Sequence, residues 1–241
     1  SELTNCNIYG KAEYANPGKS VKDRAALFIV KDAINNKKIE KGGTIVEGTA
    51  GNTGIGLAIV CKEYGLNLKI VIPKTQSIEK KNKLIELGVD LIEVEAVPYS
   101  NPKNYIKQSK KIADDLKKEN SNGVYWANQF DNVINTESHI QTTAEEIWNQ
   151  TAGTIDGFTC AVGTGGTLAG VSIGLKNKNK NIKVALSDPM GSALFSHIKR
   201  KKLESSGSSI TEGIGTGRIT KNFEKALVDE AFQTDDIEAL N

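Results

Sequence analysis

The sequence Asn16-Pro17-Gly18-Lys19-Ser20-Val21-Lys22-Asp23-Arg24 leads into a predicted helix and places a lysine in its first turn. Ser20 is a typical N-cap residue, and Asp23, three positions later, completes the spacing of a capping box. Apolar residues then recur at helical spacing at Val21, Ala25, Phe28, Ile29 and Ala33. We therefore expect a helix over residues 21–35 with one buried face and with Lys22 at its start.

Lys22 occupies a position that favours an uncharged amine. The positive end of the helix dipole disfavours an ammonium group there, and burial would lower its pKa further. A neutral lysine amine can condense with a carbonyl group or take up a proton. A lysine near a helix start is more often a solvated side chain, so this segment alone leaves both interpretations open.

Short apolar strands alternate with amphipathic helices, which predicts an α/β fold with parallel sheets. The expected strands are Thr44–Glu47, Leu68–Pro73, Asp90–Val94, Val124–Ala127, Phe158–Val162 and Lys183–Ser187. The expected helices are Val21–Asn35, Thr53–Tyr64, Ile78–Leu87, Pro102–Lys118, Thr136–Gln150, Leu168–Leu175 and Ser192–Lys201. Because the turn-like segment 128–132 separates two groups of strands, we expect two sheets.

The first of two glycine-rich turns follows a strand, opens a helix and reads Glu47-Gly48-Thr49-Ala50-Gly51-Asn52-Thr53-Gly54-Ile55-Gly56. In parallel α/β sheets, ligands collect at the carboxyl ends of strands, where such turns lead into helices. Backbone N–H groups at the positive helix end suit a carboxylate or a phosphate. Thr49, Asn52 and Thr53 add side-chain donors. A tight turn whose glycines serve packing alone remains the alternative.

The second turn directly follows another apolar strand and reads Gly163-Thr164-Gly165-Gly166-Thr167. Its three glycines allow the backbone to curl around an anion, and its two threonines can donate hydrogen bonds. It lacks the Lys-Ser/Thr pair of a P-loop and the glycine spacing of a dinucleotide-binding fold. The turn therefore predicts a site for a single phosphate group.

The composition argues against several classes of protein. The 31 basic and 29 acidic residues give a net charge of +2, which predicts no general attraction to nucleic acid or to membranes. No apolar run approaches the roughly 20 residues of a membrane helix. The three cysteines and two histidines lack metal-ligand spacing, so we expect no metal site. Dispersed, reduced thiols predict a cytoplasmic protein.

Three features together describe a pyridoxal 5'-phosphate enzyme: a lysine suited to imine chemistry, a carboxylate-binding turn and a monophosphate site. The cofactor's aldehyde requires the amine, its phosphate requires the glycine turn, and an amino acid substrate requires the carboxylate site.

Four segments, in this order, resemble the cysteine synthase (O-acetylserine sulfhydrylase) and cystathionine β-synthase family: Asn16–Arg24, Thr49–Gly54, Asn128–Phe130 and Gly163–Thr167. The similarity extends over nearly the whole chain, including Glu137–Trp148 and Ile210–Ile219 with Gly213-Ile214-Gly215. Four motifs in the family's order are far more specific than any one of them.

The resemblance implies the architecture of fold-type II (tryptophan synthase β-like) pyridoxal phosphate enzymes, in which the cofactor lies in the cleft between two parallel-sheet domains. Residues 15–127 would form a smaller, mobile domain that binds the substrate carboxylate. Residues 1–14 and 128–241 would form a larger domain that binds the cofactor phosphate. The resemblance also implies that the chain is truncated at both ends and that the larger domain is incomplete at its C-terminus.

Carried over residue by residue, the resemblance assigns the site. Lys22 would hold the cofactor covalently and act as the general base. Asn52 would bind the cofactor's ring hydroxyl oxygen, and Gly213 would lie beside the cofactor. The phosphate would be held by Gly163, Thr164, Gly165, Gly166 and Thr167. The substrate carboxylate would be bound by Thr49, Ala50, Gly51, Asn52, Thr53 and Gln129.

The implied reaction is β-replacement, which makes L-cysteine from O-acetylserine and sulfide. Ala50 stands where the family usually has serine, so cystathionine synthesis and serine or threonine dehydration remain alternatives. A non-catalytic binding protein of the same fold is a further alternative. The implied partners are the small-molecule substrates, a second copy of the chain in a homodimer, and the C-terminal tail of serine acetyltransferase.

Overall fold

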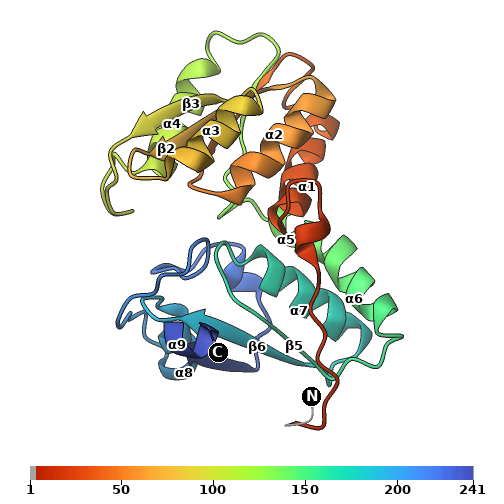
Figure 1. The fold of residues 1–241 in the computed structure, drawn as a ribbon. Coiled ribbons are helices and arrows are strands. Elements are labelled where there is room, and N and C mark those ends of the chain that lie inside the picture. Colours follow the sequence, from red (N-terminus) through yellow and green to blue (C-terminus); the bar gives the residue numbers. More distant parts are fainter. Residues whose placement is uncertain (1–3, 241) are drawn as a thin grey trace.

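Two parallel β-sheets organise the chain in a computed structural model that describes residues 4–240 (Figure 1). The first sheet has the strand order β3-β2-β1-β4 and consists of β1 Thr44–Gly48, β2 Asn67–Pro73, β3 Asp90–Val94 and β4 Val124–Trp126. The second has the order β5-β6-β7 and consists of β5 Gly157–Cys160, β6 Lys183–Pro189 and β7 Glu230–Thr234. All the strand pairs within residues 4–240 are parallel.

Helices connect the strands and cover the sheets. The first half of the chain contains the 3-10 helix η1 Glu13–Ala15 and the helices α1 Lys22–Asn35, α2 Asn52–Tyr64, α3 Ile78–Glu86 and α4 Tyr105–Leu116. The connection to the second sheet contains α5 Ile134–Ser138, the π-helical segment η2 His139–Ala144 and α6 Glu145–Gln150. The second half contains α7 Gly166–Lys178, α8 Leu194–Arg200, the 3-10 helix η3 Phe223–Lys225 and α9 Asp236–Leu240.

Each sheet has its own hydrophobic core. The first core lies where α1 and α2 pack on the first sheet, and its fully buried side chains include Ile29, Ile45, Leu57 and Ile70. The second core lies between α7, α8 and the second sheet, and it includes Leu168, Val184, Leu186 and Leu194. In Figure 1 the two sheets lie one above the other, with α1, α5 and α6 along one side.

The predicted fold class, α/β with two parallel sheets, is confirmed. All the expected strands and helices overlap observed ones, with bounds that differ by a few residues. Strand β7 was not predicted from the sequence. It lies at the edge of its sheet, and Ala231 is the one residue of its five that is buried, so its apolar pattern is weak.

The start of α1 differs from the predicted capping box. Ser20 Oγ accepts a hydrogen bond from the backbone N–H of Lys22, the first helical residue, at 3.2 Å. The Asp23 carboxylate accepts one from the N–H of Gly18 rather than of Ser20. The chain folds back tightly here, because a Cβ on Gly18 would lie 2.4 Å from Asp23 Oδ1. The predicted capping box, in which Ser20 and Asp23 would bond reciprocally, is therefore wrong. Ser20 instead binds the N–H of Lys22, and Asp23 binds the N–H of Gly18.

The helix predicted over residues 136–150 is interrupted by the π-helical segment η2. This segment faces α7 so closely that a Cβ on Gly170 would lie 2.4 Å from His139 Cβ. The wide turn holds His139 beside the second glycine turn, where its Nε2 lies 3.2 Å from Thr167 Oγ1. Single π turns within α-helices are frequent at functional sites.

Candidate active site

The two glycine turns meet at one cavity of about 900 Å³. Their sequence positions are far apart, but both turns follow the carboxyl ends of strands, which is where ligands bind in parallel sheets. Predicted site residues that line the cavity are Lys22, Thr49, Ala50, Gly51, Asn52, Thr53, Gln129, Gly163, Thr164 and Gly213. The other three, Gly165, Gly166 and Thr167, lie outside this lining, at the start of α7.

Lys22 reaches this cavity from the first position of α1. Burial lowers the pKa of its amine from the usual 10.5, as predicted. Burial also raises the pKa of the Cys160 thiol to about 12, so that thiol stays protonated. Within residues 4–240, no hydrogen bond or ion pair holds Lys22 Nζ. Its amine is therefore available to a ligand in the cavity.

The second glycine turn is tightly enclosed by neighbouring chain. A Cβ on Gly163 would lie 2.2 Å from the Gly213 carbonyl oxygen, and one on Gly166 would lie 2.1 Å from Asn135 Oδ1. The side chain of Asn135 donates a hydrogen bond to Thr164 Oγ1 at 2.9 Å. The turn leads into the 13-residue helix α7, whose free N–H groups favour an anion. These contacts fix the shape of the turn.

Thr167 meets a neutral histidine behind this turn. Burial lowers the pKa of His139 to about 3, with smaller contributions from the charges of Lys22 and Arg24. The ring Nδ1 lies 2.8 Å from Thr143 Oγ1, and Nε2 lies 3.2 Å from Thr167 Oγ1. His139 therefore fixes the Thr167 hydroxyl without adding a positive charge.

The first glycine turn is more open. A Cβ on Gly51 would meet no atom within 4 Å, and the side chain of Asn52 is exposed. Within the turn, the N–H of Gly51 donates to Thr49 Oγ1 at 3.2 Å. The side chain of Gln76 donates to the Ala50 carbonyl oxygen from outside. The helix α2 begins at Asn52, so its N-terminus faces the cavity together with these residues.

Gln129 joins the first turn to the loop after β4. It is buried, and Thr53 Oγ1 donates a hydrogen bond to its Oε1 at 2.5 Å. Its Nε2 donates to Oε1 of Glu47 at 3.2 Å. Glu47 was noted in the sequence only as the start of the turn, without a role. Its position directly after the apolar residues Ile45 and Val46 of a strand was the available signal, because a carboxyl buried there requires partners.

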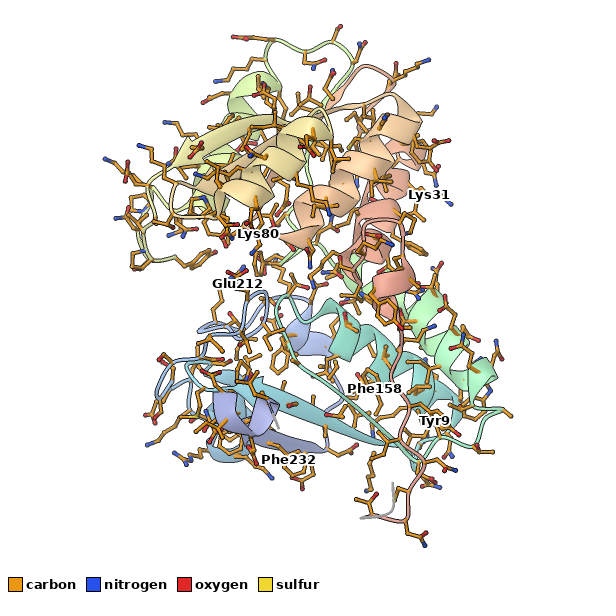
Figure 2. The ribbon with its side chains drawn as sticks, in the orientation of Figure 1. Tyr9, Lys31, Lys80, Phe158, Glu212 and Phe232 are labelled. Atoms are coloured by element: carbon orange, nitrogen blue, oxygen red, sulfur yellow. The ribbon has the colours of Figure 1, made fainter. Side chains whose placement is uncertain are left out.

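The sequence reasoning also missed the residues at the mouth of the cavity. Arg218 is held by an ion pair with Asp131 at 3.2 Å, and its guanidinium lies 4.5 Å from the centre of the Tyr99 ring. Lys80 on α3 forms an ion pair with Glu212 from the other side of the cavity. Figure 2 shows Lys80 and Glu212 approaching each other between the two sheets. These contacts join segments that are far apart in the sequence, so a local sequence pattern does not reveal them.

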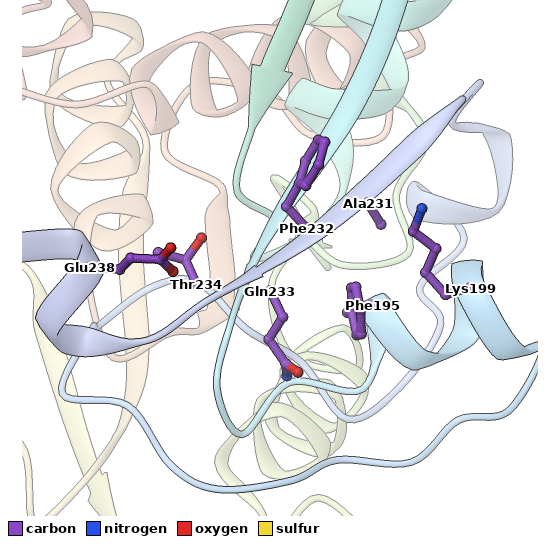
Figure 3. A pocket seen from close by; sticks show the side chains of 7 residues that line it. All are labelled: Phe195, Lys199, Ala231, Phe232, Gln233, Thr234 and Glu238. Atoms are coloured by element: carbon purple, nitrogen blue, oxygen red, sulfur yellow. The ribbon is translucent and has the colours of Figure 1, made fainter. Parts of the chain in front are cut away.

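A second cavity of about 740 Å³ lies beside β7 (Figure 3). Its lining combines apolar and polar side chains, namely Phe195, Lys199, Ala231, Phe232, Gln233, Thr234 and Glu238. None of the predicted site residues is among them. In residues 4–240, no three His, Cys, Asp or Glu side chains are arranged to hold a metal ion. The helices of the same range are too short or too polar to cross a membrane.

The whole chain, residues 1–241, matches the family described as pyridoxal-phosphate dependent enzymes. The chain therefore belongs to this family, which confirms the family resemblance of its motifs. Similar relatives include cysteine synthase 1 of Neurospora crassa, at 51% identity over 241 residues, and cysteine synthase 1 of Emericella nidulans, at 52% over 227 residues. These alignments cover 98% and 93% of this chain, but 63% and 60% of the relatives. The chain thus spans less than two thirds of the length of these relatives.

Solved structures with the same fold include a hydrogen sulfide-producing enzyme from Fusobacterium nucleatum, with a TM-score of 0.81 and 35% identity. That match covers 95% of this chain and 73% of the other. An O-acetylserine dependent cystathionine beta-synthase from Helicobacter pylori matches with a TM-score of 0.82 and 32% identity, over 96% of this chain and 71% of the other. Both support the two-sheet architecture described above.

The residues of the cavity fit pyridoxal 5'-phosphate. The cofactor needs an amine that is easily deprotonated, and Lys22 has a lowered pKa and no protein partner within residues 4–240. It also needs a phosphate site, and Gly163 and Gly166 leave no room for a side chain in a turn that leads into a helix N-terminus. Lys22 and the second turn would therefore hold the two ends of the cofactor.

Proposed function

We propose that this protein makes L-cysteine from O-acetylserine and sulfide by a pyridoxal phosphate-dependent β-replacement. One observation carries the proposal: Lys22, with a pKa lowered by burial, opens into the same cavity as both glycine turns. The relatives named cysteine synthase, which match over nearly all of this chain, support the choice of reaction. The balanced reaction consumes O-acetylserine and sulfide and releases acetate.

Lys22 has two tasks in this proposal. Its Nζ would hold the cofactor covalently, and as a free amine it would accept the proton from the substrate Cα. The lowered pKa of Lys22 leaves the amine ready for both tasks. Pyridoxal 5'-phosphate supplies an electron sink for the charge that develops at Cα when that proton leaves.

The remaining predicted residues bind and orient. The N–H groups and side chains of Thr49, Ala50, Gly51, Asn52, Thr53 and Gln129 hold the substrate carboxylate. The cofactor phosphate is held by Gly163, Thr164, Gly165, Gly166 and Thr167. Asn52 binds the cofactor's ring hydroxyl oxygen, and Gly213 lies beside the cofactor. Two carboxylate-binding segments orient the substrate beside Lys22, and the separate phosphate turn orients the cofactor.

Residues 15–127 act as the smaller domain in this proposal, and residues 1–14 and 128–241 act as the larger one. The smaller domain moves when substrate binds, because its glycine turn carries the carboxylate site, and the movement excludes water from the cavity. The ion pair of Lys80 with Glu212 across the cavity mouth supports such a closed arrangement.

Cystathionine synthesis is the second candidate. Ala50 removes a hydroxyl from the carboxylate turn, and one similar structure is an O-acetylserine dependent cystathionine beta-synthase. Both reactions begin with loss of the same Cα proton, so they place the same demand on Lys22 and differ in the thiol that adds.

The proposed partners are an amino acid substrate, sulfide and a second copy of the chain in a homodimer. The C-terminal tail of serine acetyltransferase is a further proposed partner, since its terminal carboxylate would suit the same turn as the substrate carboxylate. A cytoplasmic location is part of the proposal and is supported by the free thiols of Cys61 and Cys160.

Product analysis on the full-length protein tests the reaction. The protein is incubated with O-acetylserine and sulfide, and separately with serine and homocysteine, and the amino acids formed are identified. We expect cysteine from the first mixture and a much slower reaction in the second. Efficient cystathionine formation, with little cysteine, would overturn the proposal in favour of the second candidate.

A further inference from the structure

Glu47 is a buried acid beside the proposed carboxylate site, and the proposed mechanism leaves it without a task. It lies near the end of β1, at the start of the first glycine turn, and is only 1% exposed. Strand β4 pairs with β1 in parallel, so the loop that follows β4 reaches the same edge of the sheet. That loop carries Gln129, which places the two side chains side by side.

Glu47 holds Gln129 at two points. Gln129 Nε2 donates to Oε1 of Glu47 at 3.2 Å, and the backbone N–H of Gln129 donates to Oε2 at 3.4 Å. At the other end of the same amide, Thr53 Oγ1 donates to Gln129 Oε1 at 2.5 Å. Glu47, Gln129 and Thr53 are each less than 5% exposed, so bulk water does not compete for these bonds.

These partners decide which way the Gln129 amide points. The Thr53 hydroxyl can donate or accept, so it does not discriminate between the amide oxygen and nitrogen. Both oxygens of the Glu47 carboxyl accept N–H groups of Gln129, so Glu47 draws the amide nitrogen toward itself and turns the amide oxygen toward Thr53. The amide nitrogen carries a second hydrogen, which remains available to an acceptor in the cavity that Gln129 lines.

The surroundings of Glu47 support an acceptor role. Burial raises the pKa of its carboxyl to about 8, and N–H groups of Gln129, Asn128 and Gly48 oppose that rise. All of these neighbours present N–H groups to Glu47, so its carboxyl oxygens act as acceptors toward them.

We infer that Glu47 is a positioning residue, which orients the Gln129 amide so that one of its N–H groups faces the carboxylate of the bound amino acid. The inference rests on the proposed function in one respect, the binding of a substrate carboxylate by Gln129. Glu47 itself touches neither substrate nor cofactor in this account.

Binding measurements test this role without turnover. The full-length protein loaded with pyridoxal phosphate is titrated with L-serine, or with ethanolamine, which lacks the carboxylate, and Kd is read from the change in cofactor absorption. We expect Glu47→Gln to raise the Kd for L-serine about tenfold and to leave that for ethanolamine within about twofold. Asp188→Asn is the matched control, because Asp188 is also buried near the end of a strand but bonds to Phe195 rather than to Gln129.

A double mutant separates positioning from general damage. In a Gln129→Ala background, Glu47→Gln should change the Kd for L-serine less than about twofold, because the amide that it orients is gone. If Glu47→Gln does not fold, Glu47→Asp replaces it in both comparisons. Aspartate keeps the carboxyl group but places it farther from Gln129, because its side chain is shorter.

The inference is overturned if Glu47→Gln leaves the Kd for L-serine unchanged, weakens both ligands equally, or weakens L-serine tenfold in the Gln129→Ala background as well. These readings do not depend on the product. A protein that shows the expected Kd pattern but forms no cysteine would contradict the proposed function and leave the role of Glu47 standing.

Discussion

The two glycine turns share a local plan, a strand that ends in glycines and threonines before a helix, but they differ in what packs on them. At the second turn, added Cβ atoms on Gly163 and Gly166 would lie 2.2 and 2.1 Å from neighbouring oxygens. At the first, a Cβ on Gly51 would meet nothing within 4 Å. Gly163 and Gly166 are needed for close packing at the second turn, whereas Gly51 leaves open space at the first.

The groups that support the turns differ as well. Asn135 and Thr220 hold the second turn, Asn135 through Thr164 Oγ1 and Thr220 through a 2.7 Å hydrogen bond to the Thr164 carbonyl, and neither side chain titrates. The first turn depends on Glu47, whose pKa is raised to about 8, through Gln129 and Thr53. The difference suits a permanently bound cofactor phosphate at one turn and an exchangeable substrate carboxylate at the other.

The largest expected effect concerns Lys22, which lines the cavity at which both turns meet. Lys22→Ala should abolish covalent cofactor attachment and lower turnover by at least about a thousandfold, because the tether and the base are lost together. The change is measured by visible absorption and by the initial rate of product formation. Lys31→Ala, an exposed change on the same helix, is the control and should leave both unaltered. Retained cofactor absorption in Lys22→Ala would assign the tether to another residue.

Adding one methyl group to each turn sharpens the comparison directly. Gly166→Ala should destabilise the protein by about 2 kcal/mol or more, because the methyl group overlaps Asn135. Gly51→Ala should cost less than Gly166→Ala, because the space around Gly51 is open. Urea denaturation measures both free energies of unfolding. Equal losses would mean that the two turns are packed alike.

The pH dependence of stability tests the role of the Glu47 carboxyl, which supports the first turn. The folded pKa of Glu47 is raised from 4.5 to about 8, so between these values the folded state keeps a proton that the unfolded state has released. Stability from this group is therefore highest below the unfolded pKa and falls as the pH rises, by at most about 1.4 kcal/mol per unit.

The measurement is the melting temperature of the wild type and of Glu47→Gln between pH 5 and pH 8. The wild type should lose stability relative to the variant as the pH rises. Parallel curves would show that the carboxyl titrates normally and that the two turns do not differ in this respect.

The smallest expected effect comes from restoring a hydroxyl to the first turn. Ala50→Ser should lower the Kd for O-acetylserine by roughly two- to tenfold, the worth of one added hydrogen bond. Titration by cofactor absorption measures it, and the affinity for pyridoxal phosphate should not change. An altered affinity for pyridoxal phosphate would mean that the first turn also contributes to cofactor binding.

Most of the fold could be predicted because its signals are local. Apolar runs such as Leu68–Pro73 and the helical spacing from Val21 to Ala33 report burial within one element. Strand β7 was not predicted, because it is a short edge strand with one buried residue and so has a weak apolar pattern. The π-helical turn at His139 depends on the close approach of α7 at Gly170, which is a contact between distant segments.

The site was predictable to the extent that its residues stand in glycine-rich turns. Lys22, Thr49–Thr53 and Gly163–Thr164 carry recognisable patterns, and they line one cavity. Glu47 and Arg218 carry no local pattern, because each acts through a partner more than 80 residues away, Gln129 and Asp131. Such pairs follow from the packing of the sheet and not from spacing along the chain.

Locating the cofactor on the chain tests the central claim most directly. The full-length protein loaded with pyridoxal phosphate is reduced with borohydride and digested, and the modified peptide is identified by mass spectrometry. The account predicts a single phosphopyridoxyl group, attached to Lys22. Modification of a different lysine, or none after loading, would contradict it.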